Sequence, residues 1–217
     1  MNTTELFQLC FYFNNEVIIF FNMDKRRAFF PGSFDPFTKG HFNIFLRALN
    51  IFDHIVIGVG HNSLKKGFFD IDTRKQIIDE SIDKYFADGW GWFKEDNPEF
   101  FKRWEIVDYD CLTVEACKQY NCKTIIRGVR NMLDFENERA IADANKKIDN
   151  KIDTIIIPTE QEFGHISSTA VRDLLLHKDD IDPIKLFDFM LITKERLIEL
   201  MNKQNRVPEV MSMLSKF

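Results

Sequence analysis

Short apolar runs alternate with longer amphipathic segments along most of the chain. Residues 55–59, 124–126 and 154–157 are continuously apolar and rich in β-branched side chains, as is typical of strands buried on both faces of a sheet. Between these runs, apolar residues recur every three or four positions, which indicates helices. We expect strands near 28–30, 54–60, 105–108, 123–126 and 154–158, and helices near 41–52, 72–86, 113–120, 134–148, 167–176 and 183–203.

This alternation predicts an α/β fold. Strand–helix–strand units join parallel strands through right-handed crossovers, and repeated units build a doubly wound, Rossmann-like sheet with helices on both faces. We expect five parallel strands and a helical tail at the C-terminus. Because ligands of such folds bind beyond the carboxyl ends of the strands, functional residues are expected in the loops that follow strands.

The composition indicates an ordinary globular protein. Of 217 residues, 45% are hydrophobic and 29% are charged, which excludes disorder as the main state. The net charge of -5 argues against a duplex nucleic acid as partner, although a local cationic pocket could still bind small anions. The apolar stretches are too interrupted for a membrane span. The four cysteines lack zinc-site or C-x-x-C spacing, which fits free thiols in a reducing cytoplasm.

We expect one domain with three additions. The apolar N-terminus has no preceding basic residue and is interrupted by Asn14-Asn15-Glu16, so it does not resemble a secretory signal. The functional chain is expected to begin near Met23. The expected parts are a leader at 1–22, a domain at 23–187 with an aromatic insertion near 86–103, and a helical extension at 188–217.

The loop after the first expected strand carries the strongest chemical signal. It reads Pro-Gly-Ser-Phe-Asp-Pro-Phe-Thr-Lys-Gly-His over residues 31–41. Gly32 and Gly40 permit positive φ or a close backbone approach, and Ser33 offers a hydroxyl and an amide. His41 falls in the first turn of a helix, where amides and the helix dipole favour anions. An isolated histidine there would more often be a surface or capping residue.

This loop resembles the T/S-x-G-H signature of nucleotidylyltransferases. Residues 126–145, which begin Ile-Arg-Gly-Val-Arg-Asn, and the run Ile-Ser-Ser-Thr at 166–169 extend the similarity over residues 24–187. The middle block makes the chain similar to the phosphopantetheine adenylyltransferases of bacterial coenzyme A synthesis, whereas the other two blocks indicate only the superfamily. The resemblance implies transfer of the adenylyl group of ATP to 4′-phosphopantetheine, giving dephospho-coenzyme A and pyrophosphate.

The resemblance also implies roles for individual residues. His41 would stabilise charge on the α-phosphate, and Arg130 would face the phosphates. Lys65 would bind the substrate phosphate and stabilise the transition state. Lys66 adjoins Lys65, so the alignment with the family lysine is open by one position. The acceptor would contact Ser33, Lys65, Thr113 and Arg127. The nucleotide would contact Ser33, Phe34, His41, Gly128, Val129, Arg130, Glu138, Phe163, Gly164, His165, Ile166, Ser167, Ser168 and Thr169.

Mg²⁺ is expected because it would neutralise the triphosphate and the departing pyrophosphate. Asp35 is the nearest carboxylate, and we assign no protein ligand to the metal. The family implies a homohexamer. Two alternatives stay open: another nucleotidylyltransferase that accepts nicotinamide mononucleotide or glycerol phosphate, and a non-catalytic nucleotide-sensing module. A different acceptor would not explain the presence of the 127–145 block. A nucleotide-sensing module would be expected to lack His41 or to have an interrupted Ser-Ser-Thr run. The basic residues His41, Lys65, Arg127 and Arg130 are expected to form a cationic pocket.

Overall fold

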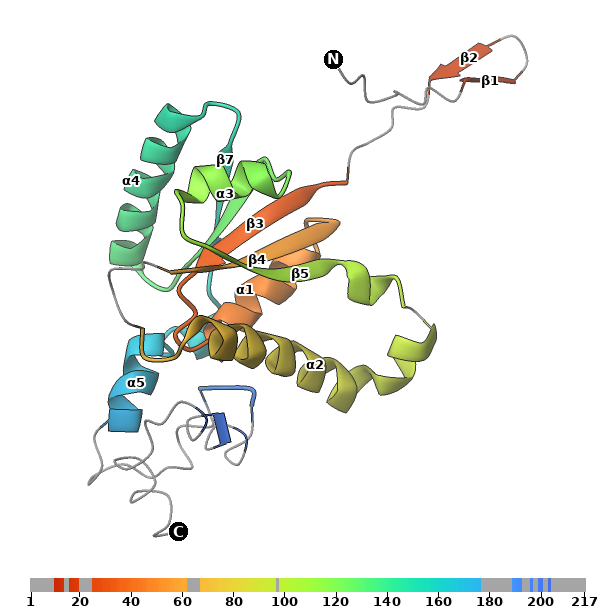
Figure 1. The fold of residues 1–217 in the computed structure, drawn as a ribbon. Helices are drawn as coiled ribbons and strands as arrows, with labels where there is room; N and C mark the ends of the chain where they lie inside the picture. The colour runs from red at the N-terminus through yellow and green to blue at the C-terminus, as the bar shows by residue number, and fades with distance from the viewer. Residues whose placement is uncertain are drawn as a thin grey trace.

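The described part of the chain forms a parallel sheet covered by helices on both faces (Figure 1). The computed structural model describes residues 10–13, 16–19, 25–61, 67–96, 98–176, 189–192, 196, 199–200 and 203, and its side chains from residue 25 onward except those of 88–96. Strands β1 (Cys10–Phe13) and β2 (Glu16–Ile19) pair separately as an antiparallel hairpin. Among the described residues, no helix is long and apolar enough to cross a membrane.

The five-stranded sheet confirms the predicted fold class. Its strands lie in the order β5-β4-β3-β6-β7, and every neighbouring pair is parallel. The strands are β3 (Arg27–Gly32), β4 (His54–Gly60), β5 (Trp104–Tyr109), β6 (Thr124–Val129) and β7 (Asp153–Pro158). The helices are α1 (Lys39–Leu49), α2 (Ile71–Asp96), α3 (Thr113–Gln119), α4 (Met132–Ile148) and α5 (Ser168–Leu176), with short 3-10 turns η1 (Phe100–Lys102) and η2 (Gln161–Phe163).

Successive strand residues supply two separate apolar layers, because neighbouring side chains in a strand point to opposite faces. Phe30 and Ile57 pack on the side of α1 and α2 with Phe45 and Ile78. Phe29, Val56 and Ile125 pack on the opposite side with Val114 and Cys117 of α3. This double burial explains the apolar runs at 55–59 and 124–126. The run at 154–157 forms β7 at the end of the strand order, where Ile155 is 36% exposed, so the expected burial of this strand on both faces is wrong.

The predicted end of α2 is wrong. The helix continues ten residues past the expected end at Phe86 and stops at Asp96, so most of the insertion lengthens a helix and does not form a separate excursion. Glycines inside a helix cost about 1 kcal/mol each, and α2 continues through Gly89 and Gly91 in spite of that preference. Phe86 anchors the region by packing on Phe100, Phe101 and Trp104, with ring centroids 5.4–5.6 Å apart.

The C-terminal extension is only partly described. Met190, Ile192 and Leu200 are buried in the core cluster on the α1 and α2 side of the sheet, and the Lys39 N–H donates to the Phe189 carbonyl (2.9 Å). Residues 189–192 are not helical, so the helix predicted at 183–203 is wrong there, and most of the rest of that range lies outside the described residues. The described residues of this extension therefore pack on the domain.

The centre of the sheet opens at the carboxyl ends of two strands. Strand β3 pairs with β4 over six residues, as far as Gly32–Val59, but with β6 only at Ala28–Thr124 and Phe29–Ile125. The chain passes from β3 to α1 and from β6 to α4, on opposite faces of the sheet (Figure 1). Such a point of divergence is the usual ligand crevice of doubly wound sheets.

Candidate active site

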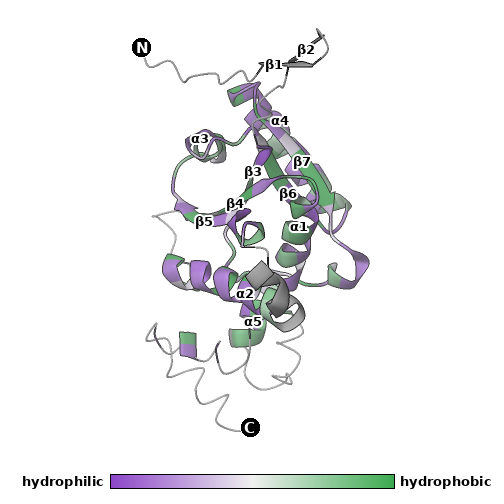
Figure 2. Ribbon diagram, turned by 90° about the vertical axis from the view of Figure 1, so that its right-hand side faces the viewer, coloured by the Kyte–Doolittle hydropathy of each residue, from purple (hydrophilic) through white to green (hydrophobic). Residues whose placement is uncertain are grey.

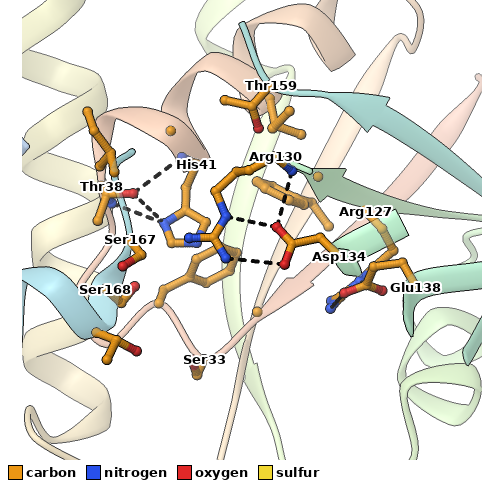
Figure 3. A pocket seen from close by; sticks show the side chains of 18 of the residues that line it. Ser33, Thr38, His41, Arg127, Arg130, Asp134, Glu138, Thr159, Ser167 and Ser168 are labelled. Carbon is orange, nitrogen blue, oxygen red and sulfur yellow. Dashed lines mark hydrogen bonds and ion pairs between the residues drawn. The ribbon is translucent and has the colours of Figure 1, made fainter. Parts of the chain in front are cut away.

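A pocket of about 390 Å³ occupies this crevice (Figure 3). Its walls come from the loop after β3, the start of α1, the end of β6, the face of α4 and the start of α5. It brings together most residues that the sequence predicted: Ser33, Phe34, His41, Arg127, Gly128, Arg130, Glu138, Ile166, Ser167, Ser168 and Thr169.

Five other described candidates do not line this pocket, and a sixth, Lys65, is not described. Phe163 borders a second cavity beside α1, and His165 meets the Phe189 ring edge-on at 5.4 Å. Thr113 begins α3, where its hydroxyl lies 3.4 Å from that of Tyr109. Val129, which is buried, and Gly164 are also absent from the lining. Lys65 and its neighbour Lys66 lie outside the described residues.

The first loop turns sharply at Phe34 and not at a glycine. No described glycine has a positive φ, whereas Phe34 has φ of 43°, so of the two possibilities that Gly32 and Gly40 left open, positive φ is not used. The buried Phe34 ring packs edge-on against the His41 ring at 5.1 Å. Gly32 is required for a different reason: a Cβ there would lie 2.6 Å from the Phe34 ring. Packing thus holds a strained residue at the site.

Thr38 and His41 form a reciprocal cap at the start of α1. The Thr38 N–H donates to His41 Nδ1 (3.1 Å), and the His41 N–H donates to Thr38 Oγ1 (3.5 Å). This capping box pairs two N–H groups that the helix itself leaves unpaired. Because a backbone N–H can only donate, Nδ1 carries no proton, and we assign the ring proton to Nε2. The ring therefore offers an N–H donor to the pocket that it lines.

The His41 ring is held neutral. Burial lowers its pKa from 6.5 to about 4, and the positive charges of Arg130 and Arg127 add to the shift. A neutral ring with its proton on Nε2 can donate a hydrogen bond without first having to be charged. At neutral pH the site therefore contains a donor of one fixed tautomer.

The lowered pKa of His41 predicts a loss of stability in acid. As pH falls, the unfolded chain binds the His41 proton near pH 6.5, whereas the folded chain resists it down to about pH 4. The stability is thus fully present above pH 6.5 and is lost toward pH 4. We expect the free energy of unfolding to fall by about 2 kcal/mol between pH 7.5 and pH 5 from this group.

Urea unfolding of the wild type and of His41→Gln at both pH values measures this contribution. The wild type should lose more stability in acid than the variant, because glutamine does not titrate. Equal losses in the two proteins would contradict the burial of a neutral His41.

Arg127 lies within β6, and not after the strand as predicted, because the strand continues to Val129. Its Nε and Nη2 donate to the two carboxylate oxygens of Glu138 on α4 (2.6 and 2.5 Å), and its Nη1 donates to the Pro31 carbonyl (2.8 Å). The arginine therefore ties the end of β3 to α4 across the crevice. Glu138, predicted to contact the nucleotide, holds Arg127 in this structure.

Arg130 has a carboxylate partner of its own. It donates from Nε (2.9 Å) and Nη2 (3.4 Å) to Asp134, which lies four residues before Glu138 on the same face of α4. Both arginines of the expected cationic pocket are therefore paired with acids that also line the pocket, so part of its positive charge is compensated. Asp134 could have been found from its i, i+4 spacing to Arg130, but that spacing alone is typical of any exposed helix pair.

The start of α5 supplies the opposite wall. Ser167 caps the helix, because its Oγ accepts from the Ala170 N–H (3.0 Å), and the Ser168 hydroxyl donates to the Pro36 carbonyl (2.8 Å). The sequence missed Arg172, one turn further along, which lines the pocket. Its guanidinium donates to the Asp35 carbonyl (2.6 Å) and to Thr169 Oγ1 (3.0 Å). Arg172 lies four residues after Ser168, which places the two on the same side of a helix, and this spacing could have identified it.

Asp35 supports the first loop from behind. Its carboxylate accepts from the N–H groups of Phe68 (2.7 Å) and Phe69 (2.8 Å), and Arg74 Nε lies 3.4 Å from it. Arg74 also donates to the carbonyls of Ser33 (3.2 Å) and Phe69 (2.7 Å). Both carboxylate oxygens are therefore engaged. No group of three or more potential metal ligands of the His, Cys, Asp and Glu types occurs within the described ranges.

The chain matches one family model over most of the domain. The family described as cytidylyltransferase-like matches residues 29–174. These residues include the loop after β3, the end of β6, most of α5 and thus every wall of the pocket.

Curated relatives are similar over nearly their whole length. A phosphopantetheine adenylyltransferase of Bacteroides thetaiotaomicron is 41% identical over 156 residues, which cover 72% of this chain and 92% of the relative. The protein of the same name from Phocaeicola vulgatus is 43% identical over 158 residues, covering 73% and 93%. That of Syntrophotalea carbinolica is 35% identical over 160 residues, covering 74% and 87%.

Solved structures share the fold at much lower sequence identity. A bifunctional NMN adenylyltransferase/ADP ribose pyrophosphatase from Francisella tularensis superposes with a TM-score of 0.60 at 13% identity, over 88% of this chain and 53% of that chain. A second structure of this protein, complexed with AMP and a manganese ion, gives a TM-score of 0.54 at 14% identity, over 88% and 52%. These likenesses support the α/β architecture.

Proposed function

Because this chain belongs to the phosphopantetheine adenylyltransferases, within the wider cytidylyltransferase-like family, we infer that it transfers the adenylyl group of ATP to 4′-phosphopantetheine. The products are dephospho-coenzyme A and pyrophosphate, so the protein is a nucleotidyltransferase of coenzyme A biosynthesis. The observation that carries this conclusion is 41–43% identity over more than nine-tenths of two relatives of that name. The signature loop of the family also lies in the central crevice of the sheet.

The reaction needs no nucleophile from the protein. An ionised oxygen of the 4′-phosphate attacks the α-phosphorus of ATP, the new P–O bond forms, and the bond from the α-phosphorus to the bridging oxygen breaks. The electron pair of that bond leaves with pyrophosphate. Catalysis therefore depends on positioning the two phosphates and on stabilising charge in the transition state.

We propose that His41 and the arginines of the pocket stabilise that charge. The neutral His41 would donate from Nε2 to a non-bridging oxygen of the α-phosphoryl group, since its Nδ1 is occupied by the Thr38 amide. Arg130 and Arg172 line two walls, and a guanidinium can hold phosphate oxygens with two parallel hydrogen bonds. The start of α5, at Ser167 and Ser168, favours an anion through its free amides.

The acceptor is proposed to bind toward the β4 side of the crevice. Lys65, which follows β4 in sequence and lies outside the described residues, is proposed to bind the 4′-phosphate together with Arg127. Thr113 begins the helix after β5, two strands from β3 in the sheet, and we propose that an extended pantetheine arm passes beside it. Ser33 lies between the two substrates in this arrangement.

We propose that magnesium enters with ATP and is bound mainly by phosphate oxygens. The described residues offer no group of protein ligands that could form a closed cage, and Asp35 is engaged by backbone amides and Arg74. A Mg²⁺ ion that keeps several waters and is bound largely by substrate phosphates fits such a donor set. The ion would offset the charge of the departing pyrophosphate.

Pyrophosphate release from Mg-ATP tests the function directly. We expect turnover with 4′-phosphopantetheine and none with nicotinamide mononucleotide or glycerol phosphate under the same conditions. Turnover only with one of the latter acceptors would identify a sibling nucleotidylyltransferase. ATP binding by a folded sample without turnover of any acceptor would indicate a nucleotide-sensing module.

We propose that the chain forms a homo-oligomer through α4, a homohexamer by the family resemblance. No residue of this helix is buried, and Leu133, Ile141 and Ile148, at spacings that place them on one side, are 70%, 49% and 56% exposed. Figure 2 shows the adjacent edge strand β7 as largely hydrophobic. An exposed apolar stripe beside a strand that ends the described sheet supports a contact between copies of the chain.

A charge placed on the apolar side of α4 is expected to dissociate the oligomer. The double variant Leu133→Glu/Ile141→Glu should elute as a smaller species, because a carboxylate cannot be buried without a partner. Light scattering after size exclusion measures the mass of each species. The matched control is Arg139→Glu, an exposed position of α4 away from the stripe, and it should leave the mass unchanged. A wild type that is monomeric throughout would contradict the proposal.

We propose that the protein is cytoplasmic. Its described cysteines Cys111, Cys117 and Cys122 are free. Burial raises the pKa of Cys117 to about 12 and that of Cys122 to about 11, which keeps both thiols protonated and unreactive. Free, inert thiols are typical of proteins in a reducing compartment.

A further inference from the structure

The Asp134 carboxylate lies where a phosphate group would be expected to bind. It accepts three hydrogen bonds from a single residue: the Arg130 N–H (3.2 Å), Nε (2.9 Å) and Nη2 (3.4 Å). Figure 3 shows the Arg130 guanidinium between the His41 ring and the Asp134 carboxylate. Backbone amides and guanidinium groups are the donors that bind phosphates. Asp134 therefore occupies the donors that an anionic ligand of this pocket needs.

The two arginine–carboxylate pairs of the pocket differ in how firmly they are fixed. Arg127 is held by Glu138 and by the Pro31 carbonyl, and its ion pair is 28% and 14% exposed. The Arg130–Asp134 pair is 36% and 26% exposed, and within the described part of the chain the Arg130 guanidinium donates only to Asp134. Because partly exposed ion pairs contribute little free energy, Arg130 is the arginine that can change partner.

Asp134 itself is fixed in place. Its backbone N–H donates to the Asn131 side chain (2.9 Å), which caps the start of α4. The carboxylate belongs to the first turn of a helix, where a negative charge is favoured. The carboxylate thus stays beside the pocket when Arg130 turns toward a ligand, and it can form the ion pair with Arg130 again when the ligand leaves.

We propose that Asp134 is the counter-ion that Arg130 exchanges for a polyphosphate and regains when pyrophosphate leaves. This inference rests on the proposed function and deepens it by assigning a positioning residue that acts through Arg130. The carboxylate competes with the ligand for the same donors, so it weakens pyrophosphate binding and favours product release. No covalent step involves Asp134.

Removing the charge of Asp134 tests the exchange. The Asp134→Asn variant should bind inorganic pyrophosphate about two- to fivefold more tightly than the wild type by isothermal titration calorimetry, because the competing ion pair is gone. Glu136→Gln removes the same charge from an exposed position of α4 outside the pocket, and it should leave the affinity unchanged. Equal or weaker binding by Asp134→Asn would overturn the proposal.

A double-mutant cycle separates exchange from a general charge effect. In an Arg130→Met background, Asp134→Asn should no longer tighten pyrophosphate binding, since the shared donor is absent. A gain of the same size in that background would also overturn the proposal. Thermal melting checks folding, and Asp134→Ser repeats the test if the asparagine variant does not fold. Wild-type turnover decides the proposed function independently of these affinities.

Discussion

Replacing His41 with alanine is expected to lower kcat about 10²–10³-fold while the Kd for ATP changes much less. In the proposed arrangement the Nε2 donor contacts a phosphoryl group whose negative charge grows as the acceptor attacks, so its hydrogen bond would strengthen in the transition state. Loss of one such donor typically costs about 3–4 kcal/mol of barrier. Pyrophosphate release gives kcat, and calorimetry with a non-hydrolysable ATP analogue gives the binding term.

The matched control is His54→Ala. His54 begins β4, at the amino end of the sheet and opposite the pocket, where its Nε2 lies 3.2 Å from a Glu105 carboxylate oxygen. We expect kcat of this variant to stay near that of the wild type. A His41→Ala variant that loses binding and rate equally would have lost ordinary affinity, which contradicts a role specific to the transition state.

The fold could be predicted because its determinants are local in the sequence. Buried parallel strands read as apolar runs, and the crevice follows from the order of the strands. The loop around His41 could be placed at the site for the same reason, since it directly follows β3. Even the helix start at Thr38 is encoded by neighbouring residues.

The partners of the charged residues could not be predicted in this way. Arg127 donates to Glu138, which lies eleven positions further along the sequence, and Arg74 donates to the Ser33 carbonyl, which lies forty-one positions earlier. Such pairs are set by how α2 and α4 pack on the sheet, and not by any spacing in the sequence. Basic residues in the motifs therefore predict positive charge in the pocket, but they do not predict how much of it is compensated by acidic partners.

The strained turn and the long helix were missed for a related reason. Propensity favours glycine at positive φ and disfavours it inside helices, yet the positive φ falls on Phe34 and α2 continues through Gly89 and Gly91. At Phe34, aromatic packing against Phe37 and His41 holds the backbone in that conformation. At Phe34 the local preference is thus overridden by tertiary packing.

Asp35→Ala is expected to be the most destabilising single substitution of the first loop. Asp35 and Arg74 are 7% and 6% exposed, and removal of the carboxylate would leave the Arg74 guanidinium and the Phe68 and Phe69 amides without this acceptor. Breaking a buried ion pair in this way typically costs about 3–5 kcal/mol. Urea unfolding of the full chain measures the loss of free energy.

The matched control is Asp53→Ala, which removes the partner of the exposed Arg26. That pair is bidentate, with oxygen distances of 2.9 and 3.2 Å, but water can replace its hydrogen bonds, so the loss of stability should be clearly smaller. Similar losses in the two variants would show that Asp35 is not an organising acceptor. Because Arg74 also holds the Ser33 carbonyl, the destabilised Asp35 variant should in addition raise KM for both substrates, whereas Asp53→Ala should leave KM unchanged.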